Sequence, residues 1–298
     1  MKLICLIGFV SALKLLGCSS ASDVVSEPLW QKEGRGLYSV SWADITLTVD
    51  PTVGGRVASL RVRDQEMLTG PEQHPVYYGS TLWLSPQHRW WPEPPAIDTD
   101  PYLVQSASNP LTLISRRDTT LNLQIKKSFR VVPRDSSLSI TYTAINRADT
   151  AQSFALWEVT RMKKDCEIML ALDTSRTQNR PFKEHTNWSI DDSVYRTHIH
   201  RTDTITQKSF SNATGWLVYA HDSLLLLKRF ADLSQAQLPP RQNEVEIYID
   251  DSAYVEIEEH SPYQPVLPGD SLQWAVHWYP RHVEHTDVVT WIRRSTNH

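Results

Sequence analysis

The chain has 298 residues, and its 30 Lys and Arg against 34 Asp and Glu give a formal net charge of −4 at pH 7. This acidic balance argues against nucleic acid as a partner, because proteins that bind nucleic acid carry basic patches that neutralise phosphates. The length exceeds one average domain, but large all-β sandwiches reach it as a single unit, so we expect one large domain.

The first predicted element is an export signal that ends before Cys18. Residues 3–16 form a mostly apolar stretch that is too short to span a membrane. It closes with Leu15-Leu16-Gly17-Cys18, the pattern that lipoprotein signal peptidase recognises before a cysteine that receives lipid. We therefore expect residues 1–17 to be removed and Cys18 to anchor the exported chain to the bacterial cell envelope, at the outer membrane facing the periplasm or the surface. An ordinary secretory peptide is the alternative, and it would export the chain as well.

A tether is predicted to follow this signal. Residues 18–36 are small, polar and without pattern, as expected of a linker between a membrane anchor and a folded body. Folding is expected to begin near Leu37, so that residues 37–298 form one domain. Lys2 and Lys14 leave with the signal and no acidic residue does, so the mature chain keeps 28 of the 30 basic residues and all 34 acidic ones.

Period-two alternation of apolar residues dominates the rest of the chain and predicts half-buried strands. It is clearest in residues 45–49, 121–131 and 138–144. Turn sequences at 133–136 and 146–149 are expected to join antiparallel neighbours. Further strands are predicted at 155–161, 193–202, 214–220, 224–230, 244–249, 254–259 and 272–279. No stretch has a convincing helical period, so the predicted fold class is all-β, one large antiparallel sandwich.

Residues 78–92 form the first segment with candidate binding residues. A loop this rich in aromatic and hydrogen-bonding side chains is typical of a binding site, with the cover of a sheet edge as the alternative. Aromatic faces stack on the apolar face of a pyranose, so Trp83 and Trp90 are predicted to stack on a sugar and Gln87 to bond its hydroxyls. His88 has the right chemistry for a general acid or base, although a lone histidine is more often a packed or solvated residue.

The predicted strand at 155–161 places charge beside apolar residues. Glu158 and Thr160 share one face, while Trp157, Val159 and Arg161 share the other. Trp157 is a further candidate for stacking on a sugar, and Glu158 is a candidate substrate-binding residue. Glu258, on a later strand, is the candidate for bonding the hydroxyls together with Gln87. A buried arginine is unfavourable unless it is paired, so Arg161 is expected to meet an acid or an anionic ligand in a cleft.

Two further strands carry candidate charges. Lys228 shares a face with apolar residues and is predicted to point inward, with Glu244 or Glu246 as its possible partner. Snorkelling at a strand end is the alternative for this lysine. Glu256 and Glu258 share one face, and two carboxylates on one side raise one pKa toward the range of a general base unless that face is simply solvated.

A metal site is a weaker interpretation. His198 and His200 are two residues apart on a predicted strand, and Glu184 and His185 precede them. Imidazoles at this spacing share a face and can chelate zinc or a similar ion. The sequence fixes no third ligand, so we predict no metal and no cofactor.

Taken in order, these segments resemble the galactose mutarotase-like (aldose 1-epimerase) superfamily. The resemblance covers residues 38–280, and it rests on the Gly-Gly turn at 53–60, the segment 78–92, the L-x-I-x-Y-x-x-x-N strand at 138–146, the Trp157 strand, and residues 255–258 before Leu267-Pro268-Gly269. The strings YGSTLWLSPQ, WEVTR, LLKRF and YVEIEEHSP look like a branch of exported bacterial lipoproteins with this fold and without an assigned activity.

This resemblance implies a β-supersandwich and a cofactor-free isomerase chemistry in which a late glutamate is the catalytic base. Glu256 matches that glutamate best, and Glu258 comes next because the register could slip by one pleat. The catalytic histidine of the family has no counterpart, because residues 157–161 read Trp-Glu-Val-Thr-Arg. The candidates for the missing acid are Arg161, Lys228 and His88. An arginine is a poor proton donor near neutral pH.

The predicted function is therefore that of an exported, lipid-anchored carbohydrate-binding protein with a mutarotase-like cleft, in which Glu256 is the base of an epimerase or mutarotase step if the protein is an enzyme. A non-catalytic glycan-binding lipoprotein of a polysaccharide uptake or degradation system is the alternative. A structural envelope protein without a cleft is a third hypothesis. The predicted partners are the membrane and a carbohydrate, an acidic one if Arg161 and Lys228 face it.

Overall fold

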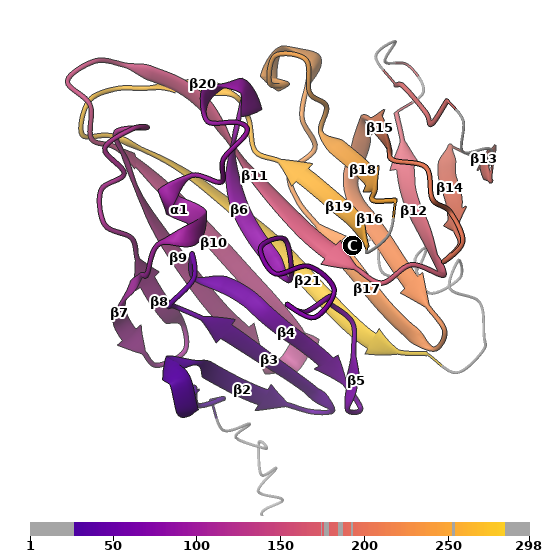
Figure 1. Ribbon diagram of the computed structural model, residues 1–298, viewed down its shortest axis with the longest axis horizontal. Coiled ribbons are helices and arrows are strands. Elements are labelled where there is room, and N and C mark those ends of the chain that lie inside the picture. Colours follow the sequence, from indigo (N-terminus) through magenta and orange to yellow (C-terminus); the bar gives the residue numbers. More distant parts are fainter. Residues whose placement is uncertain are drawn as a thin grey trace, which may run out of the picture.

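The computed structural model describes residues 27–173, 175, 179–183, 187–191, 193–251 and 254–283. These residues form two large antiparallel sheets packed face to face (Figure 1), so the predicted all-β sandwich is confirmed. The α-helix is confined to α1 (Ala96–Thr99) within these ranges. No helix in the described part of the chain is long and apolar enough to cross a membrane.

The first sheet carries the candidate site and has 11 strands among the described residues. Its order is β1 (Gln31–Lys32), β2 (Tyr38–Trp42), β3 (Ile45–Asp50), β4 (Arg56–Val62), β6 (Ser80–Ser85), β11 (Gln152–Met162), β19 (Val255–His260), β18 (Val245–Ile249) and β15 (Gln207–Ser211), with β5 (Gln65–Glu66) beside β4 and β20 (Gln264–Val266) beside β11. β11 therefore lies in the middle of the sheet and pairs with both β6 and β19.

The second sheet packs behind the first and has 10 strands in the described part of the chain. Its order is β13 (Trp188–Asp191), β14 (Val194–Ile199), β12 (Cys166–Leu172), β16 (Ala213–His221), β17 (Leu224–Arg229), β21 (Ser271–His282), β10 (Ser137–Asn146), β9 (Leu123–Val132), β8 (Leu111–Ile114) and β7 (Leu103–Ala107). Apolar residues of both sheets form one main core cluster.

Most predicted strands exist, but one expected connection and the expected start of the fold are wrong. The turn at 133–136 joins β9 to β10 as expected, with Ser136 in the left-handed conformation. The turn at 146–149 does not join neighbours, because β21 takes the place beside β10 and the chain crosses to β11 in the other sheet. The fold also begins before Leu37, since Trp30 is buried in the core and β1 pairs with β2.

The two faces of β11 have different environments, as the alternation of residues 155–161 predicts. Glu158 faces the second sheet, where it forms an ion pair at 2.6 Å with Lys228 of β17. Thr160 also accepts a hydrogen bond from Lys228 at 2.9 Å. Trp157 and Arg161 therefore lie on the opposite face, which is turned away from the second sheet.

The interior between the sheets contains a buried ionic cluster around Lys228. Its ammonium contacts Glu158 of β11 and Glu259 of β19, and all three side chains are fully buried. The predicted partners Glu244 and Glu246 are therefore wrong. Burial raises the pKa of Glu259, and the charge of Glu158 adds to this effect. Burial opposes ionisation of Glu158 as well, but Lys228 and its hydrogen bonds hold the pKa of that carboxyl below its usual range.

Candidate functional site

A pocket of about 390 Å³ lies on the face of the first sheet that is turned away from the second sheet. Five adjacent strands form its floor and contribute Trp83 (β6), Trp157 (β11), Glu256 (β19), Tyr248 (β18) and Lys208 (β15). Directly paired residues share a face of a sheet, and the register places Trp83 opposite Trp157, and Tyr248 opposite both Glu256 and Lys208. Strand pairing thus brings together side chains that are far apart in the sequence.

Three loops form the wall of this pocket. His74 and Tyr77 precede β6, Gln87 and Trp91 follow it, and Asp250 and Tyr254 lie between β18 and β19. The wall combines aromatic rings with hydrogen-bonding groups, which is the composition expected of a small-molecule site.

The aromatic rings form a connected cluster. The centroid of Trp83 lies 5.2 Å from that of Trp157, 5.1 Å from that of Trp90 and 6.1 Å from that of Tyr77. Trp83 and Trp157 are almost fully buried, so they present little ring surface to a ligand. Trp91 is 53% exposed, and Tyr77, Tyr248 and His74 are half-buried, so these rings are more accessible to a ligand.

Arg161 and Glu256 form a buried ion pair beneath the wall. Their Nε and Oε1 atoms are 2.9 Å apart, and the side chains are 0% and 8% exposed. The guanidinium also lies over the rings of Tyr77, Trp83 and Tyr254, with its Cζ 4.9–5.9 Å from their centroids. Cation–π contact adds to the ion pair here. Arg161 therefore meets an acid of its own chain, and Glu256 is the member of the pair that lines the pocket.

Lys208 is paired in a similar way. Its ammonium lies 2.7 Å from Glu246 and 2.8 Å from Glu258. Burial lowers the pKa of this lysine, but the two carboxylates raise it by more, so the net shift is upward. Burial raises the pKa of Glu258, and Trp157 donates its indole N–H to that carboxyl at 2.9 Å. Carboxylates of the chain thus already balance the charges of both Arg161 and Lys208.

His74 is the histidine that lines the pocket together with Glu256. Its Nδ1 lies 3.2 Å and 2.8 Å from the backbone N–H groups of Val76 and Tyr77. An imidazole nitrogen that accepts hydrogen bonds carries no proton, so in the neutral ring the proton is on Nε2. The ring stacks on Tyr77 with centroids 4.8 Å apart, which fixes its orientation. His74 thus carries a hydrogen-bond donor, Nε2–H, at the pocket.

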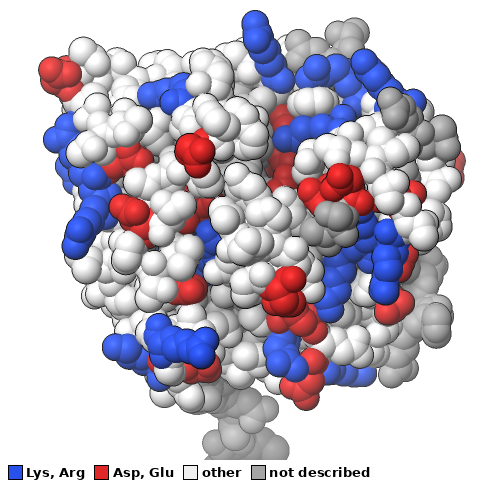
Figure 2. All heavy atoms as spheres, in the orientation of Figure 1, with Lys and Arg blue, Asp and Glu red and all other residues white. Residues whose placement is uncertain are grey.

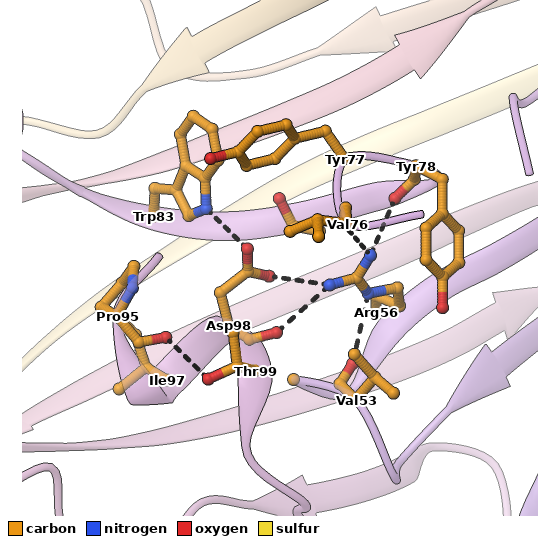
Figure 3. Close-up of polar contacts among 12 residues, drawn as sticks. Val53, Arg56, Val76, Tyr77, Tyr78, Trp83, Pro95, Ile97, Asp98 and Thr99 are labelled. Carbon is orange, nitrogen blue, oxygen red and sulfur yellow. Dashed lines mark hydrogen bonds and ion pairs between the residues drawn. The ribbon is translucent and has the colours of Figure 1, made fainter. Parts of the chain in front are cut away.

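A buried ion pair between Arg56 and Asp98 holds the loops of the wall (Figure 3). Arg56 donates to the carbonyls of Val76 and Tyr78, on either side of Tyr77. Asp98 accepts the indole N–H of Trp83 at 2.8 Å. Arg56 follows the Gly-Gly turn, where a Cβ on Gly54 would lie 2.1 Å from the carbonyl oxygen of Asp98. The turn needs glycine because α1 packs directly against it.

The structure places four of the predicted site residues in the pocket, namely Trp83, Gln87, Trp157 and Glu256. Two more lie just behind its lining, since Arg161 pairs with Glu256 and Glu258 pairs with Lys208 below the floor. Trp90 packs behind Trp83, and its indole N–H is bonded to the carbonyl of Leu84.

The remaining predicted residues do not line the pocket. Glu158 and Lys228 lie on the inner face of the first sheet and between the sheets, so neither reaches a ligand on the outer face. His88 is exposed and does not line the pocket. The acid of a proton transfer would therefore not come from Lys228 or His88.

Several lining residues were missed by the sequence reasoning. They are His74, Tyr77, Trp91, Lys208, Tyr248, Asp250 and Tyr254. Trp91 lies in the candidate segment 78–92 and Tyr254 in the predicted strand 254–259. In both segments the sequence analysis chose other residues as candidates. Lys208 is on β15, a five-residue edge strand without a strong alternation signal. His74 precedes the aromatic segment by four residues, and its proximity to Tyr77 is the signal that would have found it.

The structure describes two of the four residues of the candidate metal site, His198 and His200. The rings of His198 and His200 lie 4.4 Å apart between centroids, and both side chains are exposed. Glu184 and His185 lie outside the described residues. Within the described ranges, no group of three or more His, Cys, Asp and Glu side chains is arranged to hold a metal ion.

Comparison with solved structures defines the class of this protein as a galactose mutarotase-like β-sandwich. A galactose mutarotase-like protein from Clostridium acetobutylicum matches 86% of this chain and 99% of its own at 10% identity, with a TM-score of 0.60. One from Lactobacillus casei matches 83% of this chain and 100% of its own at 12% identity and a TM-score of 0.59. A TPR-domain containing protein from Parabacteroides distasonis matches 85% of this chain but 48% of its own, at 13% identity and a TM-score of 0.58. At these identities the likeness is one of fold.

Within this class, the chain belongs to the family DUF4380, described as a domain of unknown function, whose model matches residues 39–280. The match spans both sheets and all lining residues of the pocket. No curated protein matches the chain in sequence.

Proposed function

We propose that the pocket binds an uncharged sugar ring. The observation that carries this proposal is the combination of accessible aromatic rings with hydrogen-bonding groups whose charges are already balanced. Tyr77 and Tyr248 offer aromatic surface for the apolar face of a pyranose, while Gln87, Asp250 and Glu256 offer partners for hydroxyls. The mutarotase-like fold of the neighbouring structures supports the same class of ligand.

The charges favour an uncharged sugar over the acidic one that the sequence suggested. An anionic ligand would need a cation whose charge is not already balanced by carboxylates of the chain. Arg161 is buried and paired with Glu256, and Lys208 is paired with Glu246 and Glu258. On the face shown in Figure 2, basic and acidic side chains are interspersed rather than gathered in one field.

Anomer exchange is the second candidate function, favoured by the presence of Glu256 and His74 in one pocket. In this step Glu256 takes the proton of the anomeric hydroxyl while the Nε2–H of His74 donates a hydrogen bond to the ring oxygen. The bond between the anomeric carbon and the ring oxygen breaks, an aldehyde forms, and the ring oxygen takes up the proton held by Glu256. Closure on the other face of the aldehyde returns that proton to the anomeric oxygen and yields the opposite anomer. No cofactor is needed, because the step involves no net oxidation.

Exchange between the anomers of D-galactose and D-glucose, followed by proton NMR, tests the catalytic step. Glu256→Gln is expected to slow exchange at least about 100-fold while leaving sugar binding within about threefold, since general acid–base catalysis contributes about 10²–10⁴-fold. His74→Gln is also expected to slow anomer exchange. Glu167→Gln is the matched control, because Glu167 lies in the second sheet in a half-exposed pair with Arg196.

The outcomes separate the two functions. Binding of a neutral sugar without exchange by the wild-type protein would leave a binding protein and exclude the isomerase step. Failure of a panel of neutral sugars to bind the folded wild-type protein in calorimetry would overturn the carbohydrate proposal itself. Tighter binding of D-glucuronate than of D-glucose would contradict the charge argument.

We also propose that the chain is exported and lipid-anchored through Cys18, which lies outside the described residues. The support is the sequence Leu15-Leu16-Gly17-Cys18 after an apolar stretch. In cells fed labelled palmitate, the wild-type chain is expected to incorporate label and sediment with membranes, whereas Cys18→Ala does neither. Cys166→Ala is the matched control, because Cys166 is a buried free cysteine. Equal labelling of the wild type and Cys18→Ala would contradict the proposal.

A further inference from the structure

Trp91 is unusual among the apolar side chains of this protein because it lines the pocket and is still 53% exposed. The other large exposed apolar residues in the described ranges are aliphatic: Leu29, Val76, Leu103, Ile190, Ile205 and Leu267. Trp83 and Trp157 in the same pocket are 4% and 1% exposed. The accessible indole surface of the pocket is therefore concentrated at Trp91.

The backbone that carries Trp91 is firmly held. The N–H groups of Trp90 and Trp91 both donate to the carbonyl of Gln87 at 3.1 Å, and the indole of Trp90 donates to the carbonyl of Leu84 in β6 at 2.7 Å. The Trp90 ring lies 6.2 Å from that of Trp91 and 5.1 Å from that of Trp83. A tryptophan braced in this way presents its open surface at little cost in side-chain entropy on binding.

The adjoining Arg89 ties the same loop to the start of β11. Its guanidinium donates to the side chain of Gln152 at 2.5 Å and to the carbonyl of Ser153 at 3.3 Å. The loop is thus attached to both β6 and β11, the two central strands that carry Trp83 and Trp157. The position of Trp91 relative to the floor is set by the same strands that build the floor.

Three polar residues of the pocket, Glu256, Lys208 and Tyr248, come from the sheet itself, whereas Trp91 comes from a loop. A sugar ring whose hydroxyls bond to the floor contacts these sheet residues. Trp91 is 53% exposed, so its ring offers further apolar surface. A second ring joined to the first would cover it.

We infer that the occupant of the pocket is the terminal ring of an oligosaccharide, and that Trp91 stacks on the ring next to it. This inference rests on the proposed sugar binding and extends it by one subsite. The oligosaccharide is expected to be neutral, because the charges of Arg161 and Lys208 are already balanced by carboxylates of the protein. If anomer exchange occurs, the ring on the floor is the reducing end, because only that ring of a linear oligosaccharide has a free anomeric hydroxyl.

The test is a calorimetric comparison of monosaccharides with their own trisaccharides, using glucose with maltotriose and cellotriose, mannose with mannotriose, and N-acetylglucosamine with chitotriose. The wild-type protein is expected to bind one trisaccharide at least about tenfold more tightly than its monosaccharide. Trp91→Ala is expected to remove that advantage, about tenfold or 1.4 kcal/mol, and to leave the monosaccharide affinity unchanged within about twofold. Trp91→Tyr is expected to restore part of it.

Leu103→Ala serves as the control, because Leu103 is 65% exposed and lies on β7 in the second sheet. Equal affinity of the wild type for mono- and trisaccharides would overturn the second subsite and leave the proposed function intact. An equal loss for both sugars in Trp91→Ala would also overturn it, because Trp91 would then belong to the first ring. Failure of the wild type to bind any of these sugars would overturn the proposed function, and with it this inference.

Discussion

Replacement of Lys228 by methionine is expected to lower the free energy of unfolding by about 3–5 kcal/mol at pH 7, the range found when one member of a buried ion pair is removed. Lys228 is fully buried with Glu158 and Glu259, and its ammonium also donates a hydrogen bond to Thr160 at 2.9 Å. Tyr142 and Trp278 also donate to Glu158. Without the lysine, Glu158 would keep its charge in the interior with neutral donors only.

The pH dependence of this effect has a definite sign. In Lys228→Met, burial without a cation raises the folded-state pKa of Glu158 above its unfolded value of about 4.3. A carboxyl group whose pKa is raised in the folded state contributes stability at pH values below its unfolded pKa. This contribution is lost as the pH rises through its folded-state pKa. The deficit of the variant relative to the wild type is therefore expected to shrink as the pH falls from 7 toward 4.

Urea unfolding at several pH values measures this prediction. The double variant Lys228→Met/Glu158→Gln is expected to recover part of the loss, because it removes the charge along with its partner. Lys126→Met is the matched control, since Lys126 is exposed on β9 and its replacement should change stability by no more than about 0.5 kcal/mol. A loss below about 1 kcal/mol in Lys228→Met would show that the ionic cluster does not support the fold.

The local parts of this architecture were predictable from the sequence. Period-two alternation identifies β3, β9, β10 and β11, because each strand has one face in the core and a different environment on the other. The same alternation separates Glu158 from Arg161 before any pairing is known. It also places Glu256 and Glu258 on one face of β19, which the structure confirms.

Pairing between distant strands was not predictable in the same way. Arg161 meets Glu256 because β11 and β19 are neighbours, and nothing local in either strand specifies that neighbour. The partners of Lys228 were sought on the next strand in sequence, β18, but they come from β11 and β19. The same limit explains why residues 146–149 were assigned to a hairpin, since a turn sequence does not say whether the chain stays in its sheet.

The wall of the pocket was the least predictable part. Loops carry His74, Asp250 and Trp91, and loop residues have no periodicity that reveals where they point. Composition singled out the aromatic segment, of which Trp83, Gln87 and Trp91 line the pocket, but burial decides which of its rings a ligand can reach. Trp157 was expected to stack on a sugar, yet it is 1% exposed, whereas Trp91 is open.

Replacement of Arg56 by methionine is expected to affect both stability and sugar binding, although Arg56 does not line the pocket. The variant removes the ion-pair partner of the buried Asp98 carboxylate, which predicts a loss of about 3–5 kcal/mol in the free energy of unfolding. It also removes the donors that hold the carbonyls of Val76 and Tyr78. Tyr77 lies between those two carbonyls, so its ring would no longer be fixed at the pocket (Figure 3).

Asp98→Asn is expected to be milder, because an amide oxygen can still accept the indole N–H of Trp83 and Arg56 keeps its carbonyl acceptors. The double variant Arg56→Met/Asp98→Asn is therefore expected to be more stable than Arg56→Met alone. Arg63→Met is the matched control, since the Arg63–Asp44 pair is about half exposed and contributes at most about 1 kcal/mol.

Unfolding and calorimetric titration of the same variants, at a temperature where each is folded, separate the two effects. Arg56→Met is expected to bind a neutral sugar about tenfold more weakly than the wild type, which corresponds to 1.4 kcal/mol. The loss should fall on the first sugar ring and persist in Trp91→Ala, because Arg56 acts through Tyr77 and Trp83 rather than through the outer loop. A folded Arg56→Met protein with unchanged affinity would show that the ion pair stabilises the fold without positioning the pocket.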